Sequence, residues 1–152
     1  MNYKLVNENF VENYVQNLLR ARGIEDFDEY MNPPPDALQS PHDLKNIGVA
    51  AALYTRVVIQ NARPRILLIV DSDCDGITSA AIFYQYTKQL NCHAQIDYWI
   101  HDGKQHGLSD HIDKLMASGV TYDLLVAPDS SSNDKTYHDM LADIHLPCLI
   151  LD

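Results

Sequence analysis

The sequence lacks the features that mark several classes of protein. Its three cysteines, Cys74, Cys92 and Cys148, have neither zinc-ligand spacing nor an even pairing pattern, so we expect no disulfide framework and no zinc module. We find no signal peptide and no apolar run long enough to cross a membrane. These absences favour a protein of the reducing cytoplasm that does not bind membranes.

Positive charge is also scarce. The chain has 11 Lys and Arg residues against 21 Asp and Glu residues, which gives a net charge of −10. This balance argues against a strongly basic nucleic-acid surface, although a local basic groove or DNA contacts made elsewhere remain open. The length of 152 residues suits one domain, and 46% hydrophobic residues are enough to build a core.

One stretch of the chain, residues 65–82, organises the rest. Ile66–Val70 is an unbroken apolar run that predicts a strand buried on both faces. Thr78–Leu90 then has helix-compatible apolar residues. Between them lie three carboxylates at alternate positions and a glycine: Asp71, Asp73, Asp75 and Gly76. Sites in open parallel sheets form at the carboxyl ends of strands, which is where this acidic turn is expected.

Three carboxylates this close together favour a divalent cation among them, because the ionised forms repel one another. Oxygen ligands and the lack of a sulfur pattern indicate Mn²⁺ or Mg²⁺. An EF-hand loop is the first alternative, but Ile82 stands where its last ligand, a Glu, is required, and a strand precedes the turn. A solvated acidic turn without metal is the second alternative.

The rest of the chain predicts an α/β fold, a parallel β-sheet flanked by helices, with a helical N-terminal lead-in. We expect the lead-in to cover residues 1–64 and to pack on a domain covering residues 65–152. Its expected helices are 8–22, 27–31 and 41–61, with an extended proline-rich segment at 32–36. Further strands are expected at 94–100, 122–127 and 147–151, and further helices at 109–119 and 134–144.

Polar residues gather at the expected strand ends. Asp71, Asp129 and Asp152 each lie at or just beyond the carboxyl end of an apolar strand, and so does the loop 101–106 with its histidines. Because these ends share one edge of a parallel sheet, we expect the acidic turn, the loop and both later aspartates to meet in one cleft.

The motifs then resemble those of the DHH phosphoesterase superfamily, and most closely the RecJ-like single-stranded-DNA exonucleases. The stretch DSDCDGITSA resembles the first motif of that family, and the similarity covers essentially the whole chain. The other matching segments are LLRARGI (18–24), YMNP (30–33), SPHDL (40–44), HGL (106–108), DLLVAPD (123–129) and LILD (149–152).

The resemblance implies a Rossmann-like DHH domain with a two-metal site that hydrolyses phosphodiesters. Asp73, Asp75 and Asp129 would be Mn²⁺ ligands, with Asp129 bridging two ions and central to catalysis, and Asp71 a ligand or close acceptor. His106 and Gly107 would line the scissile phosphate. His101 falls near the position of a family Arg, and Lys104 could supply that charge. Asp152 would stand beside the metal ligands.

By the same resemblance, the substrate would be single-stranded DNA degraded from its 5′ end in repair or recombination. Asp152 matches the first letter of the DHH motif and is the last residue, so we expect this chain alone to be a weak or inactive nuclease. Its partner would be the missing C-terminal half or a repair protein. The alternatives are a DHH phosphodiesterase for short RNA or cyclic dinucleotides, a non-catalytic binding module, and an unrelated D-x-D phosphatase.

Overall fold

A computed structural model describes residues 13–37, 40–103 and 107–152 of the chain. It divides into two compact units, Met1–Lys45 and Asn46–Asp152. The domain boundaries predicted from the sequence, 1–64 and 65–152, stay predictions. The second unit begins at Asn46. The reason is that the apolar face of the helix after Asn46 forms part of the core under the sheet, as Val57 and Val58 show.

The first unit consists of short helices. Helix α1 spans Tyr14–Ala21, and the side chain of Asn13 accepts a hydrogen bond from the Val15 amide at its start. Helix α2 spans Phe27–Met31, as expected. Two 3₁₀ turns follow, η1 at Pro35–Ala37 and η2 at Pro41–Asp43. Residues 8–12 of the first expected helix lie outside the described residues.

The single helix expected over 41–61 is wrong in its first third. Asn46 adopts a left-handed backbone conformation with φ 66°, which no helix can continue through. Helix α3 therefore starts at Ile47 and runs to Tyr54, and a π-helical turn, η3, continues it over Thr55–Ile59. The side-chain amide of Asn91 donates to the carbonyl oxygens of Val58 and Asn61, and so satisfies acceptors that the irregular turn leaves open.

Within the described residues, four strands form one parallel sheet in the order β2-β1-β3-β4. The strands are β1 (Arg65–Val70), β2 (Gln95–Ile100), β3 (Leu124–Pro128) and β4 (Cys148–Leu151). Their connecting helices are α4 (Cys74–Leu90), α5 (Ser109–Ser118) and α6 (Lys135–Asp143). This confirms the predicted α/β class, a parallel sheet flanked by helices.

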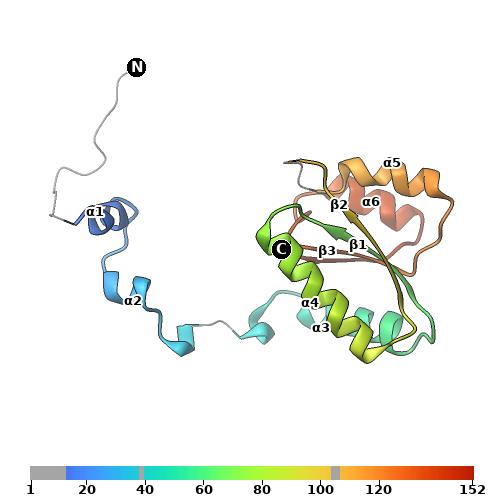
Figure 1. The fold of residues 1–152 in the computed structure, drawn as a ribbon, viewed down its shortest axis with the longest axis horizontal. Coiled ribbons are helices and arrows are strands. Elements are labelled where there is room, and N and C mark those ends of the chain that lie inside the picture. The colour runs from blue at the N-terminus through green and yellow to red at the C-terminus, as the bar shows by residue number, and fades with distance from the viewer. Residues whose placement is uncertain (1–12, 38–39, 104–106) are drawn as a thin grey trace, which may run out of the picture. The chain divides into compact units, whose positions relative to one another are not determined.

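Alternate residues of the central strands build two cores. Ile66, Leu68 and Val70 of β1 pack on one face with α3 and α4, while Leu67 and Ile69 pack on the other face with α5 and α6. Figure 1 shows these helices on both sides of the sheet. The unbroken apolar run of β1 follows directly, because both faces of this strand are covered.

A half-buried hydroxyl pair joins the two helices on the first face. The Tyr54 and Thr87 hydroxyl oxygens lie 2.9 Å apart, and Thr87 is fully buried. We predict that Thr87→Val destabilises the chain by about 1–3 kcal/mol, because the Tyr54 hydroxyl loses its partner in a largely apolar layer. Tyr54→Phe in the Thr87→Val background should cost less than Tyr54→Phe alone. Urea unfolding of the four proteins measures this coupling, and additive effects would contradict it.

Candidate metal centre

The sheet order places three aspartates side by side. Asp71, Asp129 and Asp152 directly follow β1, β3 and β4, and these three strands are neighbours in the sheet. Because all the strands are parallel, their carboxyl ends lie at one edge. The structure thus brings together the strand-end acids that the sequence predicted to meet.

Asp71 is held beneath the first turn of α4. Its carboxylate is buried, and its Oδ1 accepts a hydrogen bond from the Ser72 amide. Gly76 makes this approach possible, since a Cβ added there would lie 2.5 Å from the Asp71 Cβ and 2.7 Å from its carbonyl oxygen. The glycine of the acidic motif is therefore required for close packing between a strand end and a helix start.

Asp73 and Asp75 belong to the start of α4. The helix begins at Cys74, four residues before the expected Thr78. Asp73 is its N-cap, and its Oδ1 accepts from the Gly76 amide at 3.0 Å. Asp75 lies in the first turn, where the helix dipole favours a negative charge. A carboxylate has two oxygens, so the capping bond through Oδ1 does not exclude metal binding through Oδ2.

Asp129 is fixed by its backbone. It has a left-handed conformation with φ 69°, which Asp and Asn tolerate better than most residues. Its amide donates to the Leu151 carbonyl oxygen at 2.8 Å, which extends the β3–β4 pairing by one bond. Asp152 in turn accepts from the Ser132 amide through Oδ2. The two aspartates are thereby held at the ends of adjacent strands.

These anchors produce a cluster of acidic oxygens. One carboxylate oxygen each from Asp71, Asp73 and Asp129 lies within 4.8 Å of the other two. Burial raises the pKa of Asp129 above its ordinary value of 3.8, and the carboxylates of Asp75, Asp73, Asp71 and Asp152 raise that pKa further. Four carboxylates therefore act electrostatically on the fifth, that of Asp129.

The donor set fits a hard divalent cation. Three carboxylate oxygens at this separation can converge on one ion, and all are of the type that Mg²⁺ and Mn²⁺ accept. A cation would also remove the repulsion that raises the Asp129 pKa. Asp75 is not a member of the triplet, although its charge acts on Asp129. Its place as a ligand stays a prediction.

The loop after β2 begins beside the acidic turn. The His101 amide donates to the Val70 carbonyl oxygen, and the Ser72 hydroxyl donates to the Gly103 carbonyl oxygen at 2.6 Å. The His101 ring is buried against His111, with the ring centroids 4.9 Å apart. His101 thus helps to hold the loop in place. Lys104 and His106 lie outside the described residues, so their predicted substrate contacts stay predictions.

Gly107 at the far end of the loop contacts a residue that the sequence analysis did not assign to the site. Its φ of 115° lies outside the range of most side chains, and a Cβ there would overlap the Asp134 carboxylate. Asp134 Oδ2 also accepts from the Leu108 amide at 2.7 Å. Asp134 therefore ties the loop to the start of α6. The sequence signal was only a glycine in a loop, which does not identify its partner.

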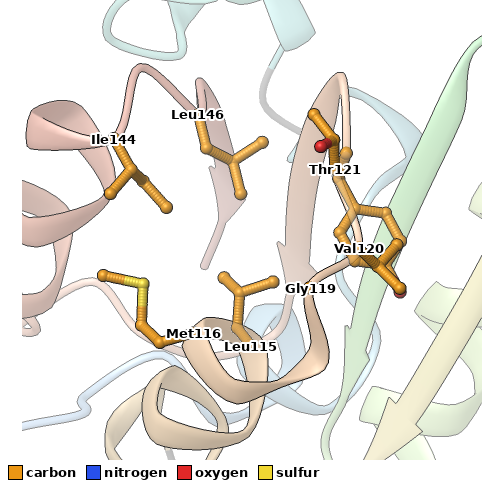
Figure 2. A pocket seen from close by; sticks show the side chains of 8 residues that line it. Leu115, Met116, Gly119, Val120, Thr121, Ile144 and Leu146 are labelled. Atoms are coloured by element: carbon orange, nitrogen blue, oxygen red, sulfur yellow. The ribbon is translucent and has the colours of Figure 1, made fainter.

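A separate hollow of about 310 Å³ lies at the opposite edge of the sheet, where β3 and β4 begin (Figure 2). Its lining is mostly apolar: Leu115, Met116, Gly119, Val120, Thr121, Tyr122, Ile144 and Leu146. Because this edge carries none of the clustered aspartates, the hollow is not part of the candidate metal centre.

No helix in the described part of the chain combines the length and apolar character needed to cross a bilayer.

Over its whole length the chain is similar to two curated proteins. One, from Bacillus subtilis (strain 168), carries the provisional name SPbeta prophage-derived single-strand DNA-specific exonuclease YorK, and the other is its counterpart in Bacillus phage SPbeta. Each is 31% identical over 153 aligned residues. The chain spans about a quarter (25%) of the length of these relatives. No protein-family model matches the chain, and no solved structure gives a significant match.

We predict that Gly76→Ala destabilises the chain by at least about 2 kcal/mol, because the new methyl group must displace the end of β1 or the start of α4. The matched control is Gly48→Ala in α3, where nothing lies within 4 Å of the added Cβ. That variant should gain about 0.5–1 kcal/mol from its higher helix propensity. Denaturant unfolding measures both changes, and equal effects at the two glycines would refute the packing argument.

The raised pKa of Asp129 predicts a pH-dependent effect of Asp129→Asn in metal-free buffer. The native state binds this proton more tightly than the unfolded chain does, so the contribution of Asp129 to stability is lost as pH rises through its native pKa. Asn has no such loss and tolerates the same backbone conformation. The melting temperature of the variant should exceed that of the parent by a margin that grows from about pH 4 to pH 7.

The control for this experiment is Asp143→Asn at the exposed end of α6, which removes the same charge away from the acidic edge. A margin for Asp129→Asn that does not grow with pH, or that grows no more than the margin of the control, would contradict the argument that the acidic edge acts on Asp129.

Proposed function

We propose that the chain is the metal-holding part of a phosphodiesterase that acts on single-stranded DNA. The observation that carries the proposal is the convergence of Asp71, Asp73 and Asp129 at the carboxyl edge of a parallel sheet. The names of the two relatives support the substrate class. The ordered motifs support the finer assignment to a RecJ-like DHH enzyme that depends on Mn²⁺, degrades DNA from the 5′ end and serves repair or recombination.

In this proposal the five acids have different roles. Asp71, Asp73 and Asp129 would hold one ion, and Asp75 would extend the site so that Asp129 is shared between two ions. Bound divalent ions supply a water of lowered pKa and neutralise charge on the reacting phosphate. Asp152 accepts from the Ser132 amide and would keep the segment after Asp129 in position. The side chains of Asp71, Asp73 and Asp152 and the backbone of Asp129 are held by hydrogen bonds before any ion arrives, so little reorganisation is required.

The loop 101–108 would supply the substrate side of the site. Its two ends are held by contacts with Val70, Ser72 and Asp134, while Lys104 and His106 lie outside the described residues. Lys104 could offer a positive charge to the phosphate, and His106 a hydrogen bond. The buried ring of His101 would affect the substrate side of the site indirectly, by holding the loop in place. The relatives are about four times as long as this chain. The activity of a complete protein that contains this site is therefore also part of the proposal.

The direct test of the site is Mn²⁺ binding by calorimetry. The parent chain should bind Mn²⁺, and Asp71→Asn and Asp129→Asn should each weaken that binding at least about tenfold, since each removes a charged ligand. Asp143→Asn removes the same charge at a position away from the site and should bind Mn²⁺ with the affinity of the parent. Unchanged binding in both site variants would refute the metal centre. Hydrolysis of single-stranded DNA, compared with short RNA, then tests the substrate class.

A further inference from the structure

Helix α4 leaves the carboxyl-terminal half of the edge strand β2 exposed on the first face of the sheet, beyond Ile96, which packs against the core. Tyr98 and Ile100 are in register with Leu68 and Val70 of β1, so their side chains project from the same face as that core. The main contacts of α4 with the sheet are made to β1 and β3, farther inward. As a result Tyr98 is 62% exposed and Ile100 is 52% exposed.

Two residues of α4, Ile77 and Tyr84, border the exposed part of β2. Tyr86 stacks on Tyr54 of α3 with ring centroids 6.4 Å apart, so that flank of α4 faces α3. Helical geometry puts Tyr84 on the opposite flank. Lys88, one turn later on this flank, donates to carbonyl oxygens of the segment that leads into β2. Ile77 lies two turns before Tyr84 and borders the same strand.

These four residues, Ile77, Tyr84, Tyr98 and Ile100, are called here the β2 strip. The strip begins at the acidic edge. Ile100 is in register with Val70, the residue before Asp71, and Ile77 follows Asp75 by two positions in α4. Tyr98 lies about 7 Å from Ile100, toward the start of the strand. The strip therefore runs from the candidate metal centre along the outer strand.

The charge of the molecule limits how it can hold DNA. A chain with net charge −10 gains little from the phosphate backbone. Exposed tyrosine rings offer the other contribution used in single-strand binding, because every base presents a face that can stack on them. A strand that places one phosphodiester at the acids brings its neighbouring bases within reach of Ile100 and Tyr98. A protein segment would also cover apolar residues, but it would not explain why the strip starts at the acids.

We propose that the β2 strip binds nucleobases of single-stranded DNA next to the phosphodiester held at the metal centre, with Tyr98 and Tyr84 as the stacking residues. The inference rests on the proposed function and adds to it the surface that receives the substrate. It assigns base stacking to β2 and α4, and leaves phosphate contacts to the loop 101–108 and to the metal centre.

The test compares Tyr98→Leu with Tyr98→Phe in the protein, using a fluorescein-labelled oligo(dT) and anisotropy, in saturating Mn²⁺ and in EDTA. Tyr98→Leu should weaken binding by about 5- to 150-fold, the range for loss of one stacked base. Tyr98→Phe keeps the ring and should bind within about twofold of the parent. The control is Tyr30→Leu, which changes a similarly exposed tyrosine in α2 and should leave the affinity unchanged.

Each other outcome overturns the assignment. Equal losses in Tyr98→Leu and Tyr98→Phe would mean that the hydroxyl matters and the ring does not. No loss in either variant, or no oligonucleotide binding by the parent, would mean that the strip does not receive bases. A parent that forms a dimer by light scattering, and becomes monomeric in Tyr98→Leu, would assign the strip to a second copy of the chain.

Calorimetry with Mn²⁺ separates this inference from the proposed function. Tyr98→Leu lies outside the acidic cluster, so its Mn²⁺ affinity should equal that of the parent. Loss of DNA binding with Mn²⁺ binding intact supports the strip. A parent that binds DNA through Tyr98 but does not bind Mn²⁺ would keep the strip and refute the metal centre.

Discussion

The candidate site depends on one constraint: the fold must hold several carboxylates close together at one edge of the sheet against their mutual repulsion. The chain places Asp71, Asp73 and Asp129 so that their oxygens lie within 4.8 Å of one another, and Asp75 and Asp152 add to the negative potential. Left to their own charges, such side chains would move apart into solvent. The arrangement persists in the structure because backbone contacts, rather than opposite charges, hold most of these residues.

Three kinds of backbone contact provide that restraint. Gly76 lets the first turn of α4 lie directly against Asp71, the cap at Asp73 uses the amide of the same glycine, and the Asp129 amide extends the β3–β4 pairing. The two cores on either side of the sheet fix the strands from which these contacts start. The energy of the fold is thus used to keep like charges close, which is how a preorganised cation site is built.

Much of the fold could be predicted from the sequence, because strong periodicity determines element type. The apolar runs of β1, β3 and β4 and the helical patterns between them identified a parallel sheet, and that in turn placed Asp71, Asp129 and Asp152 on one edge. The break at Asn46 could not be predicted, since only a positive φ at that residue interrupts the helix. Composition also could not show that residues after Asn46 belong to the core.

The details of the site were less accessible for a related reason. That Gly76 packs on Asp71, and that Gly107 packs on Asp134, depends on contacts between elements distant along the chain. A sequence motif identifies the glycine but not the atoms that pack closely against it. The roles predicted for Lys104 and His106 depend on the resemblance alone, and the exposure of Tyr98 depends on where α4 crosses the sheet, which periodicity does not specify.

The hydrogen bond from the Asp129 amide to the Leu151 carbonyl oxygen has a mechanical consequence. It couples the position of Asp129 to that of β4, because a displacement of that strand along its axis moves the Asp129 backbone with it. The outer edge of β4 has no pairing strand within the described residues. A shift of this edge strand along its axis would therefore change the distance between the Asp129 and Asp71 carboxylates.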